Sequence, residues 1–317
     1  MKTKKAMKAW VLHGINDIRL DDVPAPVIKP NEALIRVKCA SICTSDLLRV
    51  YSAGAYHYPL ILGHEVSGVV EECAQSEWIG KRVSIFPLIP CFSCESCKEG
   101  HFETCFHYSY IGSRQDGGFA EFVAVPIWNL CPIPDIVSFE EAALFEPAAV
   151  ALHAAKMLTH FDVAENVAVI GNGVIGLLVA RWLYMLGVKN AQVYGRDTIF
   201  KDNYAACFEA VGSMESMETC IDITKPNGQL ILVGNPEENF SMDRNVYWKI
   251  LRKQLTIRGS WNSCKQTDWN DVVEGIAKLE LENLISHRYK LTDLDKALKM
   301  MYEGKEKRYK VVVNNFC

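Results

Sequence analysis

The sequence of 317 residues has no long apolar run and little excess of charge of either sign. No stretch approaches the roughly 20 apolar residues that a membrane-spanning helix requires, so we expect no membrane partner. A net charge of -4 and a pI near 6.1 give no broad basic surface for nucleic acid. The sequence also lacks internal repeats and low-complexity tracts, which excludes repeat architectures.

A recognisable export signal is lacking as well. The basic residues Lys2, Lys4, Lys5 and Lys8 precede only a short apolar segment, which is too short for the central region of a signal peptide. A chain of this size does not need disulfide staples, so its twelve cysteines are better explained by metal binding than by secretion. We therefore expect a cytoplasmic protein.

The composition that remains is that of an ordinary globular protein, with 49% hydrophobic and 23% charged residues. The length is sufficient for two domains, each with its own core. Residues before 147 read as β-rich, whereas alternating strands and helices follow residue 166. We predict one domain from residues 1–146 and 280–317, and a second from residues 147–279.

Two short clusters carry side chains suited to a catalytic zinc ion. Cys43, His64 and Glu65 offer a thiolate, an imidazole and a carboxylate, which can hold one zinc and leave a position open for substrate. Ser45 can carry a proton, and Asp46 can orient the imidazole of His64. Taken singly, Cys43 is more simply a small buried side chain and His64 a core histidine. Their occurrence together favours a metal site.

The most specific pattern in the sequence is C-x2-C-x2-C-x7-C, formed by Cys91, Cys94, Cys97 and Cys105. Four thiolates at this spacing can surround a structural zinc tetrahedrally, which leaves no position for substrate. An iron–sulfur cluster is the chemical alternative, but the bacterial ferredoxin pattern has a shorter last gap and a following proline. We predict a structural zinc lobe over residues 91–105.

Glu146 stands at the start of a helix predicted over residues 148–158. Its carboxylate can be a third protein ligand of the catalytic zinc. Alternatively, it is a solvated side chain that the helix dipole favours at this end of a helix. The residues alone leave both interpretations open.

A dinucleotide-binding fingerprint follows in its required structural context. A short apolar strand at residues 167–170 leads into G-x-G-x-x-G and then into a helix that ends near residue 186. The glycines permit a tight turn, and the helix N-terminus favours a pyrophosphate. The cofactor-binding residues predicted in this turn are Gly171, Gly173, Val174, Ile175 and Gly176.

The end of the next predicted strand bears on the choice of cofactor. An acidic residue at this place would accept hydrogen bonds from the adenosine ribose and disfavour a 2′-phosphate. The sequence instead has Gly195 followed by Arg196, which favours NADP(H) over NAD(H). Asp197 is an alternative acid, two residues further on.

The dinucleotide-binding half is shorter than expected. Only about eight residues separate Gly195 from the next apolar segment at 205–210, whereas a helix, a strand and a crossover helix would need roughly thirty more. We predict a sheet of five strands that lacks the segment bordering adenosine. Further along, Pro226-Asn227-Gly228 predicts a turn before a strand at 230–233.

Together these residues resemble the zinc-containing medium-chain dehydrogenase/reductase superfamily, and its polyol dehydrogenase branch in particular. The segments that carry the resemblance are Tyr58–Gly68, Pro90–Cys94, Ile111–Arg114, Asp116–Glu121, Ile250–Lys253 and Gly259–Trp261. The resemblance covers essentially the whole chain apart from the missing segment.

The resemblance implies an α/β protein with a GroES-like β-rich catalytic domain and a shortened Rossmann-type parallel-sheet cofactor domain. It places a catalytic zinc on Cys43, His64 and Glu146, with Glu65 as a nearby or alternating ligand. The second zinc is structural and lies on the four-cysteine pattern, so two zinc ions per subunit are expected. We also expect a homodimer or a homotetramer.

The implied activity is hydride transfer between a secondary alcohol of a polyol or polyol phosphate and a nicotinamide cofactor. Arg114, Trp261 and Asn262 are weaker candidates for substrate contact, and Arg114 can equally form a structural pair with a carboxylate. The alternative function is a protein that keeps the fold and its zinc sites but has impaired catalysis and serves in binding or regulation. The intact ligand set favours the enzyme, and the missing cofactor segment favours the alternative.

Overall fold

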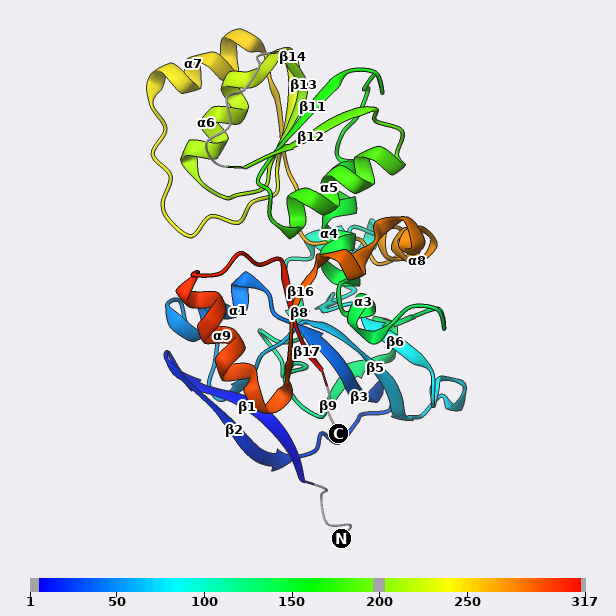
Figure 1. The fold of residues 1–317 in the computed structure, drawn as a ribbon. Helices are drawn as coiled ribbons and strands as arrows, with labels where there is room; N and C mark the ends of the chain where they lie inside the picture. Colours follow the sequence, from blue (N-terminus) through cyan, green and yellow to red (C-terminus); the bar gives the residue numbers. More distant parts are fainter. Residues whose placement is uncertain (1–5, 196–202, 315–317) are drawn as a thin grey trace. The chain divides into compact units, whose positions relative to one another are not determined.

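The computed structural model describes residues 6–195 and 203–314, which fall into two compact units (Figure 1). Unit 1 comprises Met1–Glu146 and Trp269–Cys317, and unit 2 comprises Pro147–Asp268. The second boundary thus lies at Trp269, earlier than the predicted residue 280. The reason is that Trp269 is fully buried and packs edge-on against Phe86 of unit 1, with ring centroids 5.5 Å apart.

Unit 1 consists mainly of short strands. Its strands are β1 (Ala6–Gly14), β2 (Asp17–Pro24), β3 (Glu32–Ser41), β4 (Leu60–Ile61), β5 (Glu65–Cys73), β6 (Arg82–Ile85), β7 (Leu88–Ile89), β8 (Ser109–Tyr110), β9 (Phe122–Pro126), β10 (Leu130–Pro132), β16 (Ile285–Lys290) and β17 (Lys310–Asn314). Its helices are α1 (Thr44–Tyr51), α2 (Glu95–Lys98), α3 (Phe139–Ala143), α8 (Asp268–Leu279) and α9 (Leu294–Glu303), and α4 (Phe145–Lys156) begins in unit 1 and continues in unit 2.

Strand β3 is the centre of the larger sheet, whose order is β10-β6-β5-β3-β17-β16 with β9 also paired to β3. Every residue of β3 is at least partly buried, and its charged residues Glu32, Arg36 and Lys38 occupy the partly buried positions between buried ones. The register between β3 and β5 shifts near Val37, and Gly68 accommodates the shift. A side chain at Gly68 would place its Cβ 2.3 Å from the carbonyl oxygen of Arg36, so only glycine fits.

The pairing of β3 with both neighbours gathers distant parts of the chain at one point. Ser41 at the end of β3 is opposite Glu65 on β5 and opposite Val312 on β17. Lys310 opens β17 and is buried. The sheet therefore brings residues from the start, the middle and the end of unit 1 together where the first predicted metal ligand follows.

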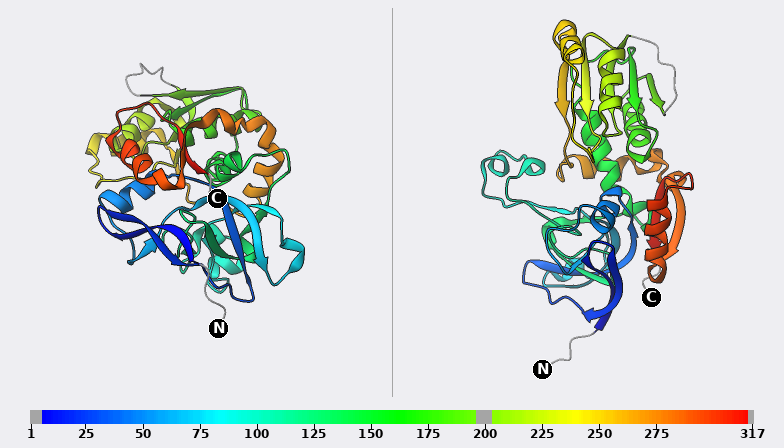
Figure 2. Two further views of the ribbon diagram at one scale, coloured as in Figure 1. Left: turned by 60° about the horizontal axis from the view of Figure 1, so that its bottom comes forward. Right: turned by 90° about the vertical axis from the view of Figure 1, so that its left-hand side faces the viewer.

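The cysteine-rich lobe extends from the rest of unit 1, as the right-hand view of Figure 2 shows. Strands β7 and β8 pair at its base. The rings of Phe92, Phe102 and Trp128 make edge-on contacts with one another, with centroids 5.2–5.6 Å apart. Trp128 also contacts Phe86 at 5.6 Å, so this aromatic cluster attaches the lobe to the core.

Unit 2 is a parallel sheet of five strands in the order β12-β11-β13-β14-β15. Its strands are β11 (Asn166–Ile170), β12 (Asn190–Tyr194), β13 (Tyr204–Glu209), β14 (Thr224–Leu232) and β15 (Thr256–Gly259), and its further helices are α5 (Val174–Met185), α6 (Met214–Ile223) and α7 (Arg244–Lys253). The predicted α/β fold class, with a GroES-like β-rich domain and a shortened Rossmann-type sheet, is confirmed. Within residues 6–195 and 203–314 there is no strand beyond β12 on that side of the sheet.

The helices of unit 2 cover both faces of its sheet. Helix α5 lies on one face, and α6 and α7 lie on the other (Figure 1). From β11 the chain first adds β12 on one side and then β13, β14 and β15 on the other, so the strand order reverses between β11 and β13. Open α/β sheets bind ligands at such a point, at the carboxyl ends of their strands. In the described parts of the chain, no helix is long and apolar enough to cross a membrane.

The turn predicted at residues 226–228 lies inside a strand. Strand β14 already begins at Thr224, which pairs with Tyr204, and the register then jumps so that Gln229 pairs with Ala206. Asn227 has a φ of 60°, in the left-handed region. The turn residues thus form an irregularity within β14 and do not precede it.

Glu209 at the end of β13 organises the following turn. Its buried Oε1 accepts hydrogen bonds from the backbone N–H groups of Val211 and Gly212, both at 2.8 Å, and from the Ser216 hydroxyl at 2.7 Å. One carboxylate therefore fixes both the turn and the start of α6.

We expect Glu209→Ala to destabilise the protein by roughly 2–4 kcal/mol, because it leaves these donors without their acceptor. The free energy of unfolding in urea measures the loss. Glu215→Ala, which removes an exposed carboxylate from the same helix, is the control and should cost under about 1 kcal/mol. Equal stability of the two variants would contradict this role of Glu209.

Candidate metal centres and cofactor turn

Cys43, His64 and Glu65 lie together in unit 1. One ligand atom of each lies within 4.8 Å of the others. Cys43 is the N-cap of α1, directly after β3, while His64 and Glu65 lie at the start of β5. The pairing of β3 with β5 therefore places all three side chains at one end of the sheet. The predicted donor set is assembled by the fold.

Asp46 lies behind His64, as predicted. Its Oδ1 is 3.5 Å from Nδ1 of His64, and its Oδ2 accepts a 3.0 Å hydrogen bond from the backbone N–H of Cys43. Burial alone would lower the pKa of His64, but the Asp46 carboxylate raises it well above the usual value. With Nδ1 directed at Asp46, Nε2 remains for a metal ion.

Glu65 is held by two partners that the sequence did not indicate. Both of its carboxylate oxygens contact the Lys310 ammonium, and one accepts a hydrogen bond from the Ser41 hydroxyl. All three side chains are buried. Burial alone would lower the pKa of Lys310, but Glu65 raises it, so the ammonium keeps its charge.

Glu146 lies close to this cluster but outside its tightest group. Its buried carboxylate accepts a 3.1 Å hydrogen bond from the hydroxyl of Tyr110. Burial, and then the charge of Glu65, raise the pKa of Glu146. The ring of Tyr110 in turn makes an edge contact with the imidazole of His64, with centroids 5.8 Å apart. The carboxylate is thus neither solvated nor free, unlike the alternative considered for a helix start.

The contacts made by Tyr110, Lys310 and Ser41 could not be found by reading the sequence. Tyr110 and Glu146 are 36 positions apart, and Lys310 and Glu65 are 245 apart. The one available signal was Lys310 itself, a single cation that opens the apolar strand β17. Ser45 is half-buried on α1, and its proposed part in proton transfer stays a prediction.

Three weaker candidates were named for substrate contact. Within the described residues Arg114 makes no carboxylate pair of the kind considered for it, and its guanidinium contacts two tyrosine rings. Trp261 and Asn262 belong to unit 2, where Trp261 is half exposed and Asn262 has a φ of 55°. Their contact with substrate stays a prediction.

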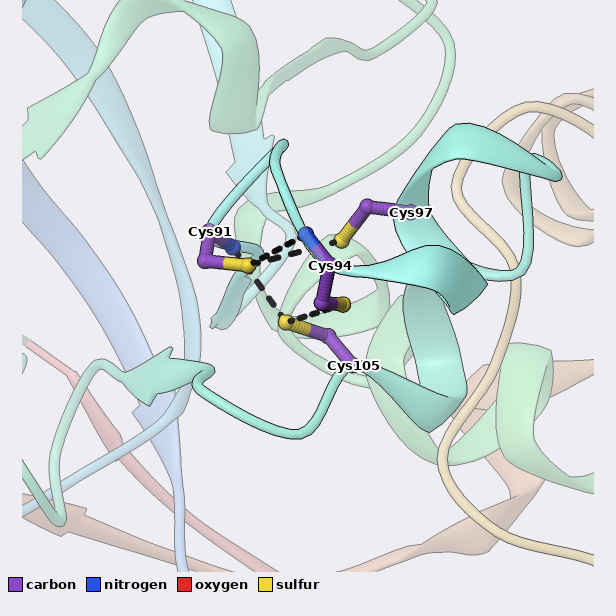
Figure 3. Close-up of side chains that lie close together, drawn as sticks. All are labelled: Cys91, Cys94, Cys97 and Cys105. Carbon is purple, nitrogen blue, oxygen red and sulfur yellow. Dashed lines mark hydrogen bonds between the residues drawn. The ribbon is translucent and has the colours of Figure 1, made fainter.

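The four cysteines of the lobe converge as their spacing predicted (Figure 3). The Sγ atoms of Cys91 and Cys97 are 3.9 Å apart, and those of Cys94 and Cys105 are 3.8 Å apart. A zinc–sulfur distance of 2.3 Å in tetrahedral geometry requires sulfurs about 3.8 Å apart, so the site fits zinc. The Ser93 hydroxyl, followed by backbone N–H groups, lowers the pKa of Cys91 to about 5. This favours the thiolate that binds metal.

The turn before α5 has the geometry of a dinucleotide site. Gly171 has a φ of 119°, and a Cβ on Gly176 would lie 1.8 Å from the carbonyl oxygen of Gly171, so both positions require glycine. Nothing lies within 4 Å of where a Cβ of Gly173 would be, which leaves room for close approach of a pyrophosphate. Val174 and Ile175 begin α5.

The cofactor-selecting position is only partly described. The side chain of Asn172 fills the place where a side chain at Gly195 would begin, with its Nδ2 2.6 Å from that point. The absence of an acid at Gly195 is therefore accommodated by packing. Arg196 and Asp197 lie outside the described residues, so the preference for NADP(H) stays a prediction.

A cavity of about 510 Å³ in unit 1 is lined by parts of β1, β2 and β9 and by residues near Leu60 and Asp116. None of the predicted metal ligands lines it. The side chains that can bind a metal converge elsewhere, at Cys43, His64 and Glu65. We therefore assign the catalytic site to that cluster and not to the cavity.

Comparison with known families agrees with this geometry. Residues 29–135 match the model of the alcohol dehydrogenase GroES-like domain, and residues 196–278 match that of the zinc-binding dehydrogenase. Galactitol 1-phosphate 5-dehydrogenase of Escherichia coli strain K12 is 32% identical over 89% of this chain and 92% of its own length. The chain belongs to the zinc-containing medium-chain dehydrogenase/reductase superfamily. The predicted resemblance is confirmed.

Two further comparisons describe the chain's place within the superfamily. The crystal structure of galactitol-1-phosphate dehydrogenase from Escherichia coli superposes with a TM-score of 0.89 at 29% identity, covering 98% of this chain and all of that one. L-threonine 3-dehydrogenase of Rhizobium etli strain CIAT 652 is 29% identical over 90% of this chain and 92% of its own length. As a member of this superfamily, the protein is a zinc-dependent, NAD(P)-dependent alcohol or polyol dehydrogenase.

The two zinc sites should differ in lability. The four-thiolate site is closed, whereas the site at Cys43 has mixed ligands and an open position. We expect mild chelation to remove about one of two zinc ions and to abolish activity before the protein unfolds. Elemental analysis, activity and circular dichroism along one chelation series measure these three events.

Cysteine variants assign each zinc to its site. Cys43→Ser should lose one zinc with little loss of folded structure, whereas Cys97→Ser should lose the other and destabilise the lobe. Simultaneous release of both ions, or the presence of iron, would contradict the assignment.

Proposed function

We propose that this protein oxidises a secondary alcohol of a polyol or polyol phosphate, and reduces the corresponding ketone, with NADP(H) as its preferred cofactor. The observation that carries the proposal is the convergence of the Cys43, His64 and Glu65 donors, with the buried carboxylate of Glu146 close by, in a protein that also has the dinucleotide turn. Two relatives, galactitol 1-phosphate 5-dehydrogenase and sorbitol dehydrogenase, are named for polyol substrates, which supports this substrate class.

The charges at the site fit a divalent cation. Glu65 and Glu146 are both buried, and the one buried ammonium near them, on Lys310, is taken up by Glu65. The sulfur of Cys43 lies beside these carboxylates as a further donor. Such a group of buried anions is costly unless a cation compensates it, and a thiolate, an imidazole and carboxylates are ligands that zinc accepts.

The same charges bear on which carboxylate binds the metal. Glu65 already has the ammonium of Lys310 and the hydroxyl of Ser41 as partners. Among the described residues, the hydrogen bond to Glu146 comes from the neutral hydroxyl of Tyr110 and uses Oε1, so its second oxygen is available to a metal ion. This supports Glu146 as the resting ligand, with Glu65 as a ligand that can replace it when Lys310 releases it.

The chain's own groups have distinct parts in the proposed reaction. A bound zinc ion supplies Lewis acidity, which lowers the pKa of an alcohol ligand toward neutrality. Asp46 keeps the imidazole of His64 in the orientation that offers Nε2. Ser45, half-buried in the first turn of α1, carries the alcohol proton toward solvent. The turn from Gly171 to Gly176 would hold the pyrophosphate of a nicotinamide cofactor, which would accept the hydride.

The proposed function also determines which binding partners we expect. A small-molecule substrate is proposed, without nucleic acid or membrane partners, and the expected homodimer or homotetramer and the cytoplasmic location remain predictions. Within residues 6–195 and 203–314 no strand lies beyond β12, and this favours the alternative of a zinc-binding protein with impaired turnover, because a strand at that edge normally borders adenosine.

The test is oxidation of galactitol, sorbitol and galactitol 1-phosphate by the zinc-loaded protein with NADP+ or NAD+ up to millimolar concentration. We expect turnover of at least one polyol, reduced about 100-fold or more in His64→Ala, since metal ions contribute several kcal/mol to such reactions. Tight zinc binding without turnover or cofactor binding would contradict the proposal and support the impaired protein.

The cofactor preference is tested at Arg196. Arg196→Ala should weaken NADPH binding by roughly 1.5–3 kcal/mol and leave NADH nearly unchanged, because only NADPH carries a 2′-phosphate for a charged hydrogen bond. Fluorescence titration measures both affinities, and Lys189→Ala, at an exposed cation of the same unit, is the control. Equal losses for both cofactors, or a wild-type preference for NADH, would show that the preference is wrong.

A further inference from the structure

Arg114 carries a charge that the rest of unit 1 does not neutralise. Among residues 6–195 and 203–314, no carboxylate lies within 4.0 Å of its guanidinium, whereas Arg36 and Arg288 each have a carboxylate at 2.6–2.7 Å. Asp116, the acid nearest in sequence, uses its Oδ1 to accept a 2.9 Å hydrogen bond from the backbone of Ile61. An unneutralised cation in a fixed position is a ready site for an anion.

The guanidinium is held in place by uncharged groups. Its Cζ lies 4.0 Å from the ring centroid of Tyr108 and 4.9 Å from that of Tyr56, and its Nη1 donates a 2.7 Å hydrogen bond to the carbonyl oxygen of Tyr108. These contacts use ring faces and one N–H group. The remaining N–H donors of the planar guanidinium are available for a ligand.

The backbone of this segment is fixed against the metal ligand His64. The N–H of Arg114 donates a 2.8 Å hydrogen bond to the carbonyl oxygen of Tyr110, and the N–H of Gly118 donates one of 2.8 Å to Gly63. A Cβ on Gly112 would lie 2.9 Å from the backbone nitrogen of His64, so the two backbones touch. The backbone that carries Arg114 is therefore hydrogen-bonded and packed against the segment of Gly63 and His64.

Side-chain contacts also connect Arg114 to the metal ligand His64. The ring of Tyr108, on which Arg114 lies, makes an edge contact with Tyr110 at 6.2 Å. Tyr110 contacts the imidazole of His64 and donates to Glu146. Two tyrosine rings in contact, those of Tyr108 and Tyr110, thus link Arg114 to the donor cluster.

We propose that Arg114 is the phosphate-binding residue of the substrate site, so that the preferred substrate is a polyol phosphate whose phosphate monoester lies away from the reacting secondary alcohol. This inference rests on the proposed function and deepens it. A guanidinium forms charge-assisted, bidentate hydrogen bonds with phosphate, and its rigid placement between rings reduces the entropy lost on binding. A free polyol gains nothing from this charge.

The test compares galactitol 1-phosphate with free galactitol in wild type and Arg114→Met, whose unbranched side chain keeps the packing on the rings. We expect wild type to prefer the phosphorylated substrate, and the variant to lose about 10–100-fold in kcat/KM for it with less than a two-fold change for free galactitol. Arg114→Lys should retain part of the preference, because it keeps the charge but not the fork of donors.

Arg244→Gln is the matched control, since Arg244 also stacks on an aromatic ring, Trp248, but lies in unit 2. It should leave both substrates unaffected. An equal loss for both substrates in Arg114→Met would assign the residue a purely structural role and overturn the proposal. A wild-type preference for free galactitol, or an Arg114-dependent preference for L-threonine, whose anion is a carboxylate, would overturn it too.

A binding measurement separates this inference from the proposed function. Thermal stabilisation by galactitol 1-phosphate is followed in wild type and Arg114→Met without cofactor. Stabilisation that disappears in the variant supports the phosphate site even if no polyol is oxidised, which would contradict the proposed function alone. Equal stabilisation, or none in either protein, overturns the inference.

Discussion

The rest of unit 1 is arranged around a small group of buried charges. Two carboxylates, those of Glu65 and Glu146, lie in a region from which water is excluded, with the thiol of Cys43 and the imidazole of His64 beside them. Lys310 compensates only one of these anions. Burial and the charge of Glu65 raise the pKa of Glu146, so this group is stable either with that carboxyl protonated or with further positive charge bound, which a divalent metal ion can supply.

This constraint explains why unit 1 is built from both ends of the chain. Cys43 follows β3, Glu65 opens β5 and Lys310 opens β17, so the charges meet only because these three strands are neighbours in one sheet. Glu146 enters from the first turn of α4, and β8 places the hydroxyl of Tyr110 against it. The structural lobe contributes indirectly, because Cys105 and β8 are only four residues apart.

The parts that could be predicted from sequence are those in which the signal is local. The four cysteines, the glycine turn and the strand–helix alternation each lie within about thirty residues, and their spacing alone determines the structure that they form. The catalytic ligands were found because each has a short motif of its own.

The parts that could not be predicted are contacts between distant segments. The contacts of Lys310 with Glu65 and of Tyr110 with Glu146 depend on strand order, which no local pattern specifies. The later domain boundary was placed wrongly for a related reason, since the burial of Trp269 against Phe86 is a tertiary contact. The turn at Asn227 was recognised as a turn, but its place inside β14 depends on pairing with β13.

The central claim is that the buried donors of unit 1 hold a zinc ion of mixed ligation beside a separate four-thiolate zinc. X-ray absorption at the zinc edge measures this directly in the intact protein. One zinc with four sulfurs and one with a single sulfur give an average of about 2.5 sulfurs per zinc, with nitrogen or oxygen making up the remainder. An average near four would show that only the lobe binds zinc and would contradict the account.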